Sequence, residues 1–188
     1  MTVQQSTDKA EMILGAALEL FEAQGFDGTA VPELARKAGV GTGTIYRYFA
    51  TKEALLNALY QRWKGAYNDA VLAPFEPGLS IRARFGLYWR RMTGFARSES
   101  RAVRFMEMHH HASYLDARSR EMTERYLATA TAFIDEGVRE GVLKQLPPQL
   151  AAALMWGALI GLMKMYPNLD DMVVAQVEEC LWDGIRRH

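Results

Sequence analysis

The stretch AGVGTGTIYRYFATKEALL, residues 38–56, constrains the fold more than any other part of the chain. Gly39 permits a tight turn, and a helix is expected to begin directly after it, near Gly41 or Thr42. On that helix Ile45 and Phe49 are four residues apart, so both should point toward a core. Because another short helical pattern precedes the glycine turn, the stretch indicates a helix-turn-helix unit.

The residues upstream complete a three-helix head. Asp8 and Glu11 form a capping-box pattern, after which apolar residues recur at helical spacing as far as Gly25, a typical helix-ending glycine. A short second helix is expected at about 30–37, with Thr29 as its cap. Its apolar residues would face the same core as the first helix.

The rest of the chain also has the periodicity of helices. A fourth helix is expected from Thr51 to about Leu72, and APFEPG, residues 73–78, ends it with two prolines and a glycine. Five further helices follow, at about 79–97, 101–112, 117–140, 148–166 and 170–187. The predicted fold is all-α with about nine helices. Its helix-turn-helix head would occupy residues 1–54, and a larger helical bundle would occupy residues 55–188.

The amino-acid composition excludes fewer classes of function than the sequence motifs do. The 188 residues are 49% hydrophobic and 23% charged, as in an ordinary globular protein, and the formal net charge of +0 gives no indication of nucleic acid. The lone Cys180 excludes an internal disulfide and suits a reducing cytosol. The N-terminus lacks the pattern of a signal peptide, and Lys164 and Pro167 interrupt the most apolar stretch, 150–163. We therefore expect a soluble, cytoplasmic protein.

Residues 12–56 resemble the DNA-binding head of the tetracycline-repressor (TetR) family of transcriptional regulators. The matching pieces are the AGV turn, the motif G-T-x-Y-x-Y-F at Gly43 to Phe49, and K-E-x-L at Lys52 to Leu55, in the required order. The body matches that family only in its length and helix count. The resemblance implies a recognition helix that enters the major groove of DNA and a lysine that reaches a phosphate. The implied DNA-contacting residues are Thr29, Thr42, Gly43, Thr44, Tyr46, Arg47, Tyr48 and Lys52.

Two positions depart from the family pattern. Gly41 stands where a serine often caps the recognition helix, so the cap is weaker or comes from Thr42. Pro32 stands where many members carry a polar side chain facing DNA, so base recognition there is in doubt. The bland alternative for this segment is a tyrosine pair packed in a small helical domain, with Tyr48 beside Phe49.

Large flexible and aromatic side chains in the body would suit an apolar ligand cavity, although ordinary core packing is the preferred interpretation of each one taken singly. The candidate ligand-binding residues are Phe95, Arg104, Phe105, Met108, His109, Tyr114, Met122, Tyr126, Met155 and Trp156. The run His109–His111 could suggest zinc, but adjacent helical residues are about 100° apart and cannot converge on one ion. A helix-end surface position is the default for these histidines, so we expect no metal and no cofactor.

A run of arginines along residues 82–104 could bind an anion or a second DNA segment, but a solvated helix face is the preferred interpretation. Arg104 lies nearest the ligand candidates. The last two helices instead have apolar faces suited to a four-helix bundle made by two subunits. The candidate dimer residues are Ala153, Gly157, Ile160, Gly161, Val173, Val177 and Leu181.

These observations predict a homodimeric, ligand-responsive transcriptional regulator. It would most simply be a repressor that binds an inverted-repeat operator of double-stranded DNA and is released by a small apolar or aromatic effector. Two alternatives stay open at this point. One is an architectural DNA-binding protein without an effector, and the other is a metal-dependent enzyme built around His109–His111, which would need ligands the sequence does not supply.

Overall fold

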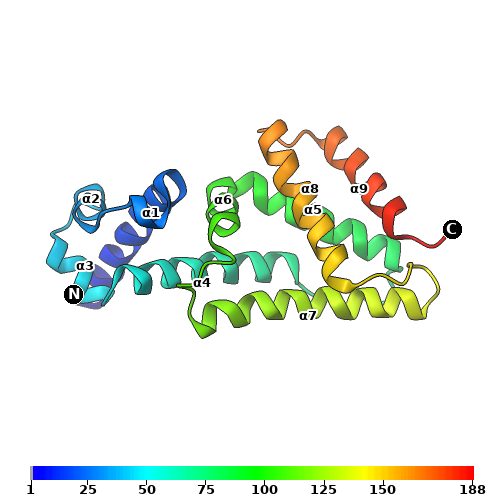
Figure 1. Ribbon diagram of the computed structural model, residues 1–188, viewed down its shortest axis with the longest axis horizontal. Coiled ribbons are helices and arrows are strands. Elements are labelled where there is room, and N and C mark those ends of the chain that lie inside the picture. Colours follow the sequence, from blue (N-terminus) through cyan, green and yellow to red (C-terminus); the bar gives the residue numbers. More distant parts are fainter. Residues whose placement is uncertain (1) are drawn as a thin grey trace. The chain divides into compact units, whose positions relative to one another are not determined.

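The computed structural model describes residues 2–188, with side-chain surroundings from Asp8 onward. Within these residues the chain is all-α, with no strand. The helices are α1 (Thr2–Gly28), α2 (Val31–Lys37), α3 (Thr42–Tyr48), α4 (Lys52–Val71), α5 (Ile81–Ser98), α6 (Ser100–His109), α7 (Ala117–Arg139), α8 (Pro148–Met165) and α9 (Asp171–Ile185). The predicted all-α fold of about nine helices is confirmed (Figure 1).

The chain divides into two compact units. We call the segments up to Lys64 and Arg101–Arg120 the N-terminal unit, and Gly65–Ser100 with Glu121–His188 the C-terminal unit. Helix α4 is continuous through the division, so it belongs to both. The expected end of a DNA-binding domain at residue 54 stays a prediction, because compactness does not identify the part that binds DNA.

The N-terminal unit packs α1 against α2, and α2 against α3. Ile13 and Phe21 of α1, Leu34 of α2 and Ile45 of α3 are almost fully buried in this unit. Phe105 of α6 belongs to the same core, with its ring 6.5 Å from that of Phe21. The helix-turn-helix is therefore part of a larger packed unit to which α6 contributes.

Two predicted boundaries of the first helix need correction. Helix α1 begins at Thr2 rather than at the capping box near Asp8. Gly25 does leave the helical region, with φ 72°, but the helix resumes for one short turn to Gly28. A positive φ is tolerated without strain only by glycine, and Gly39, with φ 66°, makes the predicted tight turn in the same way.

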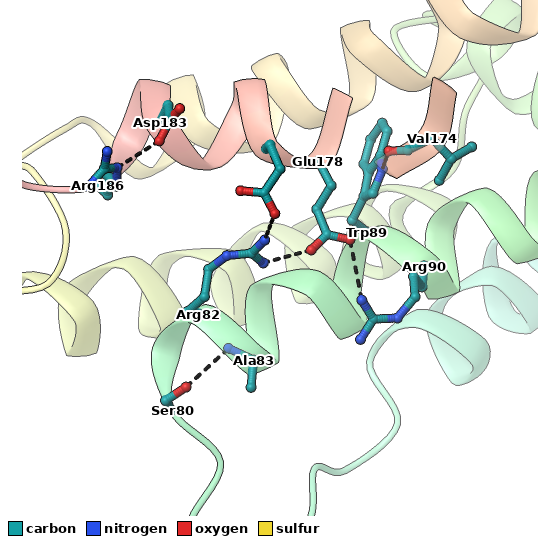
Figure 2. A network of polar contacts seen from close by, with 10 residues as sticks. Ser80, Arg82, Ala83, Trp89, Arg90, Val174, Glu178, Asp183 and Arg186 are labelled. Atoms are coloured by element: carbon teal, nitrogen blue, oxygen red, sulfur yellow. Dashed lines mark hydrogen bonds and ion pairs between the residues drawn. The ribbon is translucent and has the colours of Figure 1, made fainter. Parts of the chain in front are cut away.

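In the C-terminal unit, α5, α8 and α9 pack against one another, as Figure 1 shows. An apolar core joins Ile81 and Phe85 of α5 to Phe133 of α7 and Trp182 of α9. Trp89 of α5 is fully buried, and its Nε1 donates a 2.9 Å hydrogen bond to the carbonyl oxygen of Val174 on α9 (Figure 2). Burial and a satisfied donor together fix α9 on α5.

The arginines of α5 form ion pairs that the sequence did not indicate, although Arg90 and Arg97 are exposed, as expected for a solvated helix face. Arg82 and Arg90 both bind Glu178 of α9, which is buried, and Arg82 also binds Glu179 (Figure 2). A Cβ at Gly86 would lie 2.6 Å from Oε1 of Glu178, so the glycine leaves room for this carboxylate. The other α5 arginines with an ion pair are Arg84, which binds Glu136, and Arg97, which binds Asp171. Because the acidic partners lie far away in the sequence, local patterns could not predict these pairs.

Candidate nucleic-acid interface and effector cavity

Helix α3 has one buried residue, and its polar side chains lie outside the core. Ile45 is 2% exposed, whereas Tyr46 is 50% exposed and Arg47 is also exposed. The Arg47 guanidinium lies over the ring of Tyr48, 5.4 Å from its centroid. Thr42, Thr44 and Tyr48 are half-buried, and Gly43 is exposed. The predicted recognition helix thus carries a solvent-facing set of hydroxyl, aromatic and cationic groups, which are the groups that contact phosphates and base edges.

The N-terminal cap of α3 is weak, as the glycine in place of the family's usual serine at position 41 predicted. Gly41 is the N-cap, so the N-cap position provides no side-chain hydrogen bond to the first-turn amides. Phe49 is half-buried rather than fully inward-pointing. Amides without a side-chain cap at a helix start remain free to donate to a phosphate.

Thr29 was wrongly assigned as the cap of α2. The N-cap is Ala30, and Pro32 lies in the first turn as expected. Thr29 is 1% exposed, and its hydroxyl donates a 2.8 Å hydrogen bond to the carbonyl oxygen of Gly25. Because that hydroxyl proton is used within the chain, the side chain of Thr29 stabilises the turn between α1 and α2.

Lys52 has a structural role that the sequence did not indicate. Its Nζ donates to the carbonyl oxygens of Phe26 at 2.7 Å and Thr29 at 3.0 Å, and lies 4.2 Å from the centroid of the Phe26 ring. An ammonium has three protons, so one is left for a phosphate. Lys52 therefore joins the start of α4 to the end of α1.

We expect Lys52→Ala to lower the free energy of unfolding by about 1.5–3 kcal/mol, the range for hydrogen bonds to a charged group. Lys37→Ala is the matched control, because Lys37 makes only an exposed ion pair with Glu19, which contributes about 0–1 kcal/mol. Urea unfolding measures the free energy of unfolding of both variants. Equal stability of the two variants would show that the carbonyl contacts of Lys52 do not hold the head together.

Asn57 forms a polar clasp between α4 and the segment joining α6 to α7. Its Nδ2 donates to the carbonyl oxygen of Tyr114 at 2.8 Å, and its Oδ1 accepts from the Asp116 amide and the Ser119 hydroxyl, each at 2.8 Å. Gln61, one turn further along α4, donates to Asp116 as well. Sequence reasoning missed this clasp because an isolated asparagine on a helix has no distinguishing local pattern.

The candidate ligand residues do not form one site. Arg104, Phe105, Met108, His109 and Tyr114 lie in the N-terminal unit, where Arg104 is half-exposed and its Nε binds Glu22 at 2.6 Å. Phe95, Met122, Tyr126, Met155 and Trp156 lie in the C-terminal unit. There the rings of Phe95, Tyr126 and Trp156 surround the buried Tyr67, with centroids 5.4–5.8 Å away.

An apolar cavity of about 30 Å³ lies in the C-terminal unit. Tyr126 and Met155 line it, as predicted, together with residues that looked like ordinary core in the sequence. The added lining residues include Leu72, Phe85, Tyr88, Met92, Phe133 and Ile185. A space of this volume holds about one or two waters, so any larger occupant would have to widen it.

His109 is not the surface residue that a helix-end position suggested. It is 1% exposed, and its Nδ1 is joined to the Tyr114 hydroxyl by a 2.6 Å hydrogen bond. The rings of Phe105 and Phe21 lie 4.7 Å and 6.4 Å from its own. Burial among these side chains lowers the pKa of His109 from its ordinary 6.5 to about 4, so the imidazole is neutral at physiological pH.

The lowered pKa of His109 predicts that the folded protein loses stability in acid. Because the unfolded chain takes up the proton near pH 6.5 and the folded chain only near pH 4, the free energy of unfolding should fall as the pH drops through that window. The stabilisation is fully present above pH 6.5, and its loss by pH 4 is about 3 kcal/mol at most. Urea titrations of the wild type and His109→Phe between those pH values measure the difference. A wild-type slope that survives in His109→Phe would contradict the assignment.

Among the described residues, no three histidine, cysteine, aspartate or glutamate side chains are grouped closely enough to hold a metal ion. The rings of His110 and His111 lie against each other, with centroids 3.8 Å apart and planes inclined at 43°, and of the three histidines only His109 enters the core. The geometry of the histidine run is thus that of one core residue followed by two surface residues.

Helix α8 has an unusually apolar exposed face. Leu150 and Leu154 are 45% and 44% exposed, and Gly157 and Gly161 continue the same stripe. Of the candidate dimer residues, Ala153, Gly157 and Gly161 are exposed, Val173, Val177 and Leu181 are half-buried, and Ile160 is buried within its own chain. In the described part of the chain, α8 is also the one helix long and apolar enough to cross a membrane, although only 22% of its residues are buried.

Comparison with known proteins agrees with these features. Residues 13–59 match the model of the bacterial regulatory proteins of the tetR family, and residues 61–187 match the tetracyclin repressor-like C-terminal domain. The uncharacterised HTH-type transcriptional regulator YhgD of Bacillus subtilis is 24% identical over 93% of this chain and 94% of its own. The fatty acid metabolism regulator protein of the same organism is also 24% identical, over 84% and 82%. The structure of FadR from Bacillus subtilis in complex with stearoyl-CoA superposes with a TM-score of 0.73 at 22% identity, covering 93% and 98%.

A helix-turn-helix with an exposed polar recognition helix, continuous with a helical body, defines a DNA-binding transcriptional regulator. The two family models together span nearly the whole chain, and the protein belongs to the TetR family of transcriptional regulators.

Proposed function

We propose that this regulator is a cytoplasmic repressor that binds an inverted-repeat operator as a homodimer and is released by a largely apolar effector. The proposal that the protein binds DNA rests on the two faces of α3, one with Ile45 buried in the core and the other with Tyr46 and Arg47 exposed. A single helix-turn-helix makes too few contacts for tight specific binding. Two copies reading half-sites one helical turn apart supply the rest.

The homodimer is supported by the exposed stripe on α8. Leu150, Leu154, Gly157, Gly161 and Met165 recur at intervals of three or four residues, so they lie on one face, and Met165 is 74% exposed. A contiguous apolar face of this kind is typical of a protein interface, and the glycines allow close approach of a second helix. Leu154→Glu should therefore produce monomers in light scattering. Ala132→Glu, at a position on α7 that is also exposed, is the control that should stay dimeric.

The effector is proposed to occupy the cavity lined by Tyr88, Tyr126 and Met155. Its lining is apolar and aromatic, and two relatives point to acyl groups: one is named for fatty acid metabolism, and another was solved with stearoyl-CoA. Because the cavity measures only about 30 Å³, an acyl chain would bind a widened state in preference to the closed one. Such a difference in affinity is what a ligand needs in order to shift a conformational equilibrium.

The test begins with DNA selected by the purified protein from a genomic library. Fluorescence anisotropy then measures operator affinity at several salt concentrations and in the presence of stearoyl-CoA, stearate or coenzyme A alone. We expect affinity to fall steeply with salt and the acyl compounds to release the DNA. Met155→Trp should block the release, while Met172→Trp, at a 67% exposed position on α9, should not. Equal release of DNA from both variants would show that the effector does not bind in this cavity. Failure to select any DNA sequence would contradict the proposal that the protein is a repressor.

A further inference from the structure

A second space, separate from the effector cavity, lies wholly within the N-terminal unit between α1 and α4. It has a volume of about 180 Å³ and is lined by Glu11, Leu14, Gly15, Leu18, Leu59, Arg62 and Trp63. An engineered apolar cavity of about 150 Å³ is large enough to take up benzene. The α1–α4 groove, as we call it, thus has room for one small ring without rearrangement.

The wall of the groove is suited to an apolar body. Leu14, Leu18 and the buried Leu59 supply aliphatic surface, and Trp63 supplies an aromatic one. A Cβ built at Gly15 meets no other atom within 4 Å, so the groove is open above this glycine. The buried Nε1 of Trp63 has no hydrogen-bond partner among the described residues, which is unusual for an indole donor and leaves this side chain able to gain from a ligand.

The rim of the groove carries one ion pair, between Arg62 and Glu11. The Arg62 guanidinium is also held over the Trp63 ring, 5.7 Å from its centroid. Within the described part of the chain Glu11 makes no second ion pair, and its side chain is 51% exposed. An anionic ligand could therefore displace the Glu11 carboxylate at little cost, because exposed pairs are weak, while Arg62 stays in place to receive it.

We propose that the α1–α4 groove is a binding site for a small aromatic or branched apolar molecule that carries a carboxylate. The apolar part lies against Leu14, Leu18 and Trp63, and the carboxylate pairs with Arg62 in place of Glu11. Because α1 and α4 frame the helix-turn-helix, a ligand there would act on the DNA-binding head directly. This site is independent of the effector cavity in the C-terminal unit.

The experiment uses phenylacetate as the probe and the indole N–H signals of the full-length protein in ¹⁵N NMR spectra as the readout. The chain has four tryptophans, and Trp63→Phe identifies the signal of Trp63. We expect phenylacetate to shift the Trp63 signal saturably. Trp89, Trp156 and Trp182 all lie in the C-terminal unit, so shifts confined to them would place the probe in that unit and overturn the proposal.

Matched variants test the lining. Gly15→Leu should fill the groove and abolish the shift, whereas Gly15→Ala should retain it, since both substitutions point into open space. Leu14→Phe is a second blocking variant, to be used if Gly15→Leu does not fold. Unchanged binding in a folded blocking variant would contradict the site.

Matched probes test the charge. Benzyl alcohol lacks the carboxylate, and benzylamine reverses the charge. We expect Arg62→Gln to weaken phenylacetate at least about fivefold and to leave benzyl alcohol unaffected, as expected for the loss of one charged contact. Tighter binding of benzylamine than of phenylacetate would show that Glu11 rather than Arg62 selects the ligand, and would overturn the proposed ligand class.

Discussion

Replacement of Tyr46 by alanine is expected to abolish operator binding for practical purposes while leaving the fold intact. A side-chain contact to DNA contributes about 1–3 kcal/mol, and a homodimer loses it twice, so the total is about 2–6 kcal/mol, roughly thirtyfold or more in affinity. Tyr46 is 50% exposed. The free energy of unfolding should therefore change by no more than about 0.5 kcal/mol, as at other surface positions.

Anisotropy with the selected operator measures the loss, and circular dichroism in urea measures stability. Tyr166→Ala is the matched control, because Tyr166 is a comparably exposed tyrosine, 43%, in the C-terminal unit. An operator affinity of Tyr46→Ala within threefold of the wild type would remove Tyr46 from the interface. A loss of affinity accompanied by unfolding would instead assign it a structural role.

The largest effect on stability is expected at Trp89. Its indole is fully buried and donates to the Val174 carbonyl, so Trp89→Ala removes a large apolar surface, leaves a cavity and loses a hydrogen bond. Such substitutions cost about 3–5 kcal/mol. Trp89→Phe keeps most of the aromatic surface but loses the donor and part of the buried volume, so its cost should be lower, about 1–3 kcal/mol.

Both variants are measured by urea unfolding at one fixed protein concentration, because the stability of a dimer depends on concentration. Light scattering should also show weaker dimerisation of Trp89→Ala, since α9 would lose its anchor on α5. Equal stability of the alanine and phenylalanine variants would mean that neither the buried area nor the hydrogen bond fixes α9.

The order and extent of the helices could be predicted from the sequence because they depend on local patterns. Apolar periodicity, the prolines of residues 73–78 and the glycine turn at Gly39 defined most boundaries to within a few residues. The start of α1 was wrong, since the capping-box pattern at Asp8 and Glu11 lies inside a helix that begins at Thr2. A local cap signal marks a helix end only where the chain stops being helical.

The contacts that could not be predicted from the sequence join residues that are distant in the chain. Lys52 has the composition of a phosphate contact, and only the fold brings it to the carbonyl of Phe26. His109 looks like a surface residue until α6 is packed against α1, and the ion pairs of Arg82 and Arg90 form only because the fold places Glu178 of α9 beside both. Phe85 and Phe133 could not be distinguished from ordinary core residues, because lining a cavity leaves no periodic pattern.

We propose above all that two copies of α3 enter adjacent major grooves of one operator. Directed cleavage of DNA tests this proposal, with an iron chelate attached to Arg47→Cys in a Cys180→Ser background, and with the same reagent on the natural, exposed Cys180 as the reference. We expect two clusters of cleavage in the major groove, centred about one helical turn apart. A single cluster, or cleavage no different from that of the Cys180 reference, would show that α3 does not enter the DNA in this way.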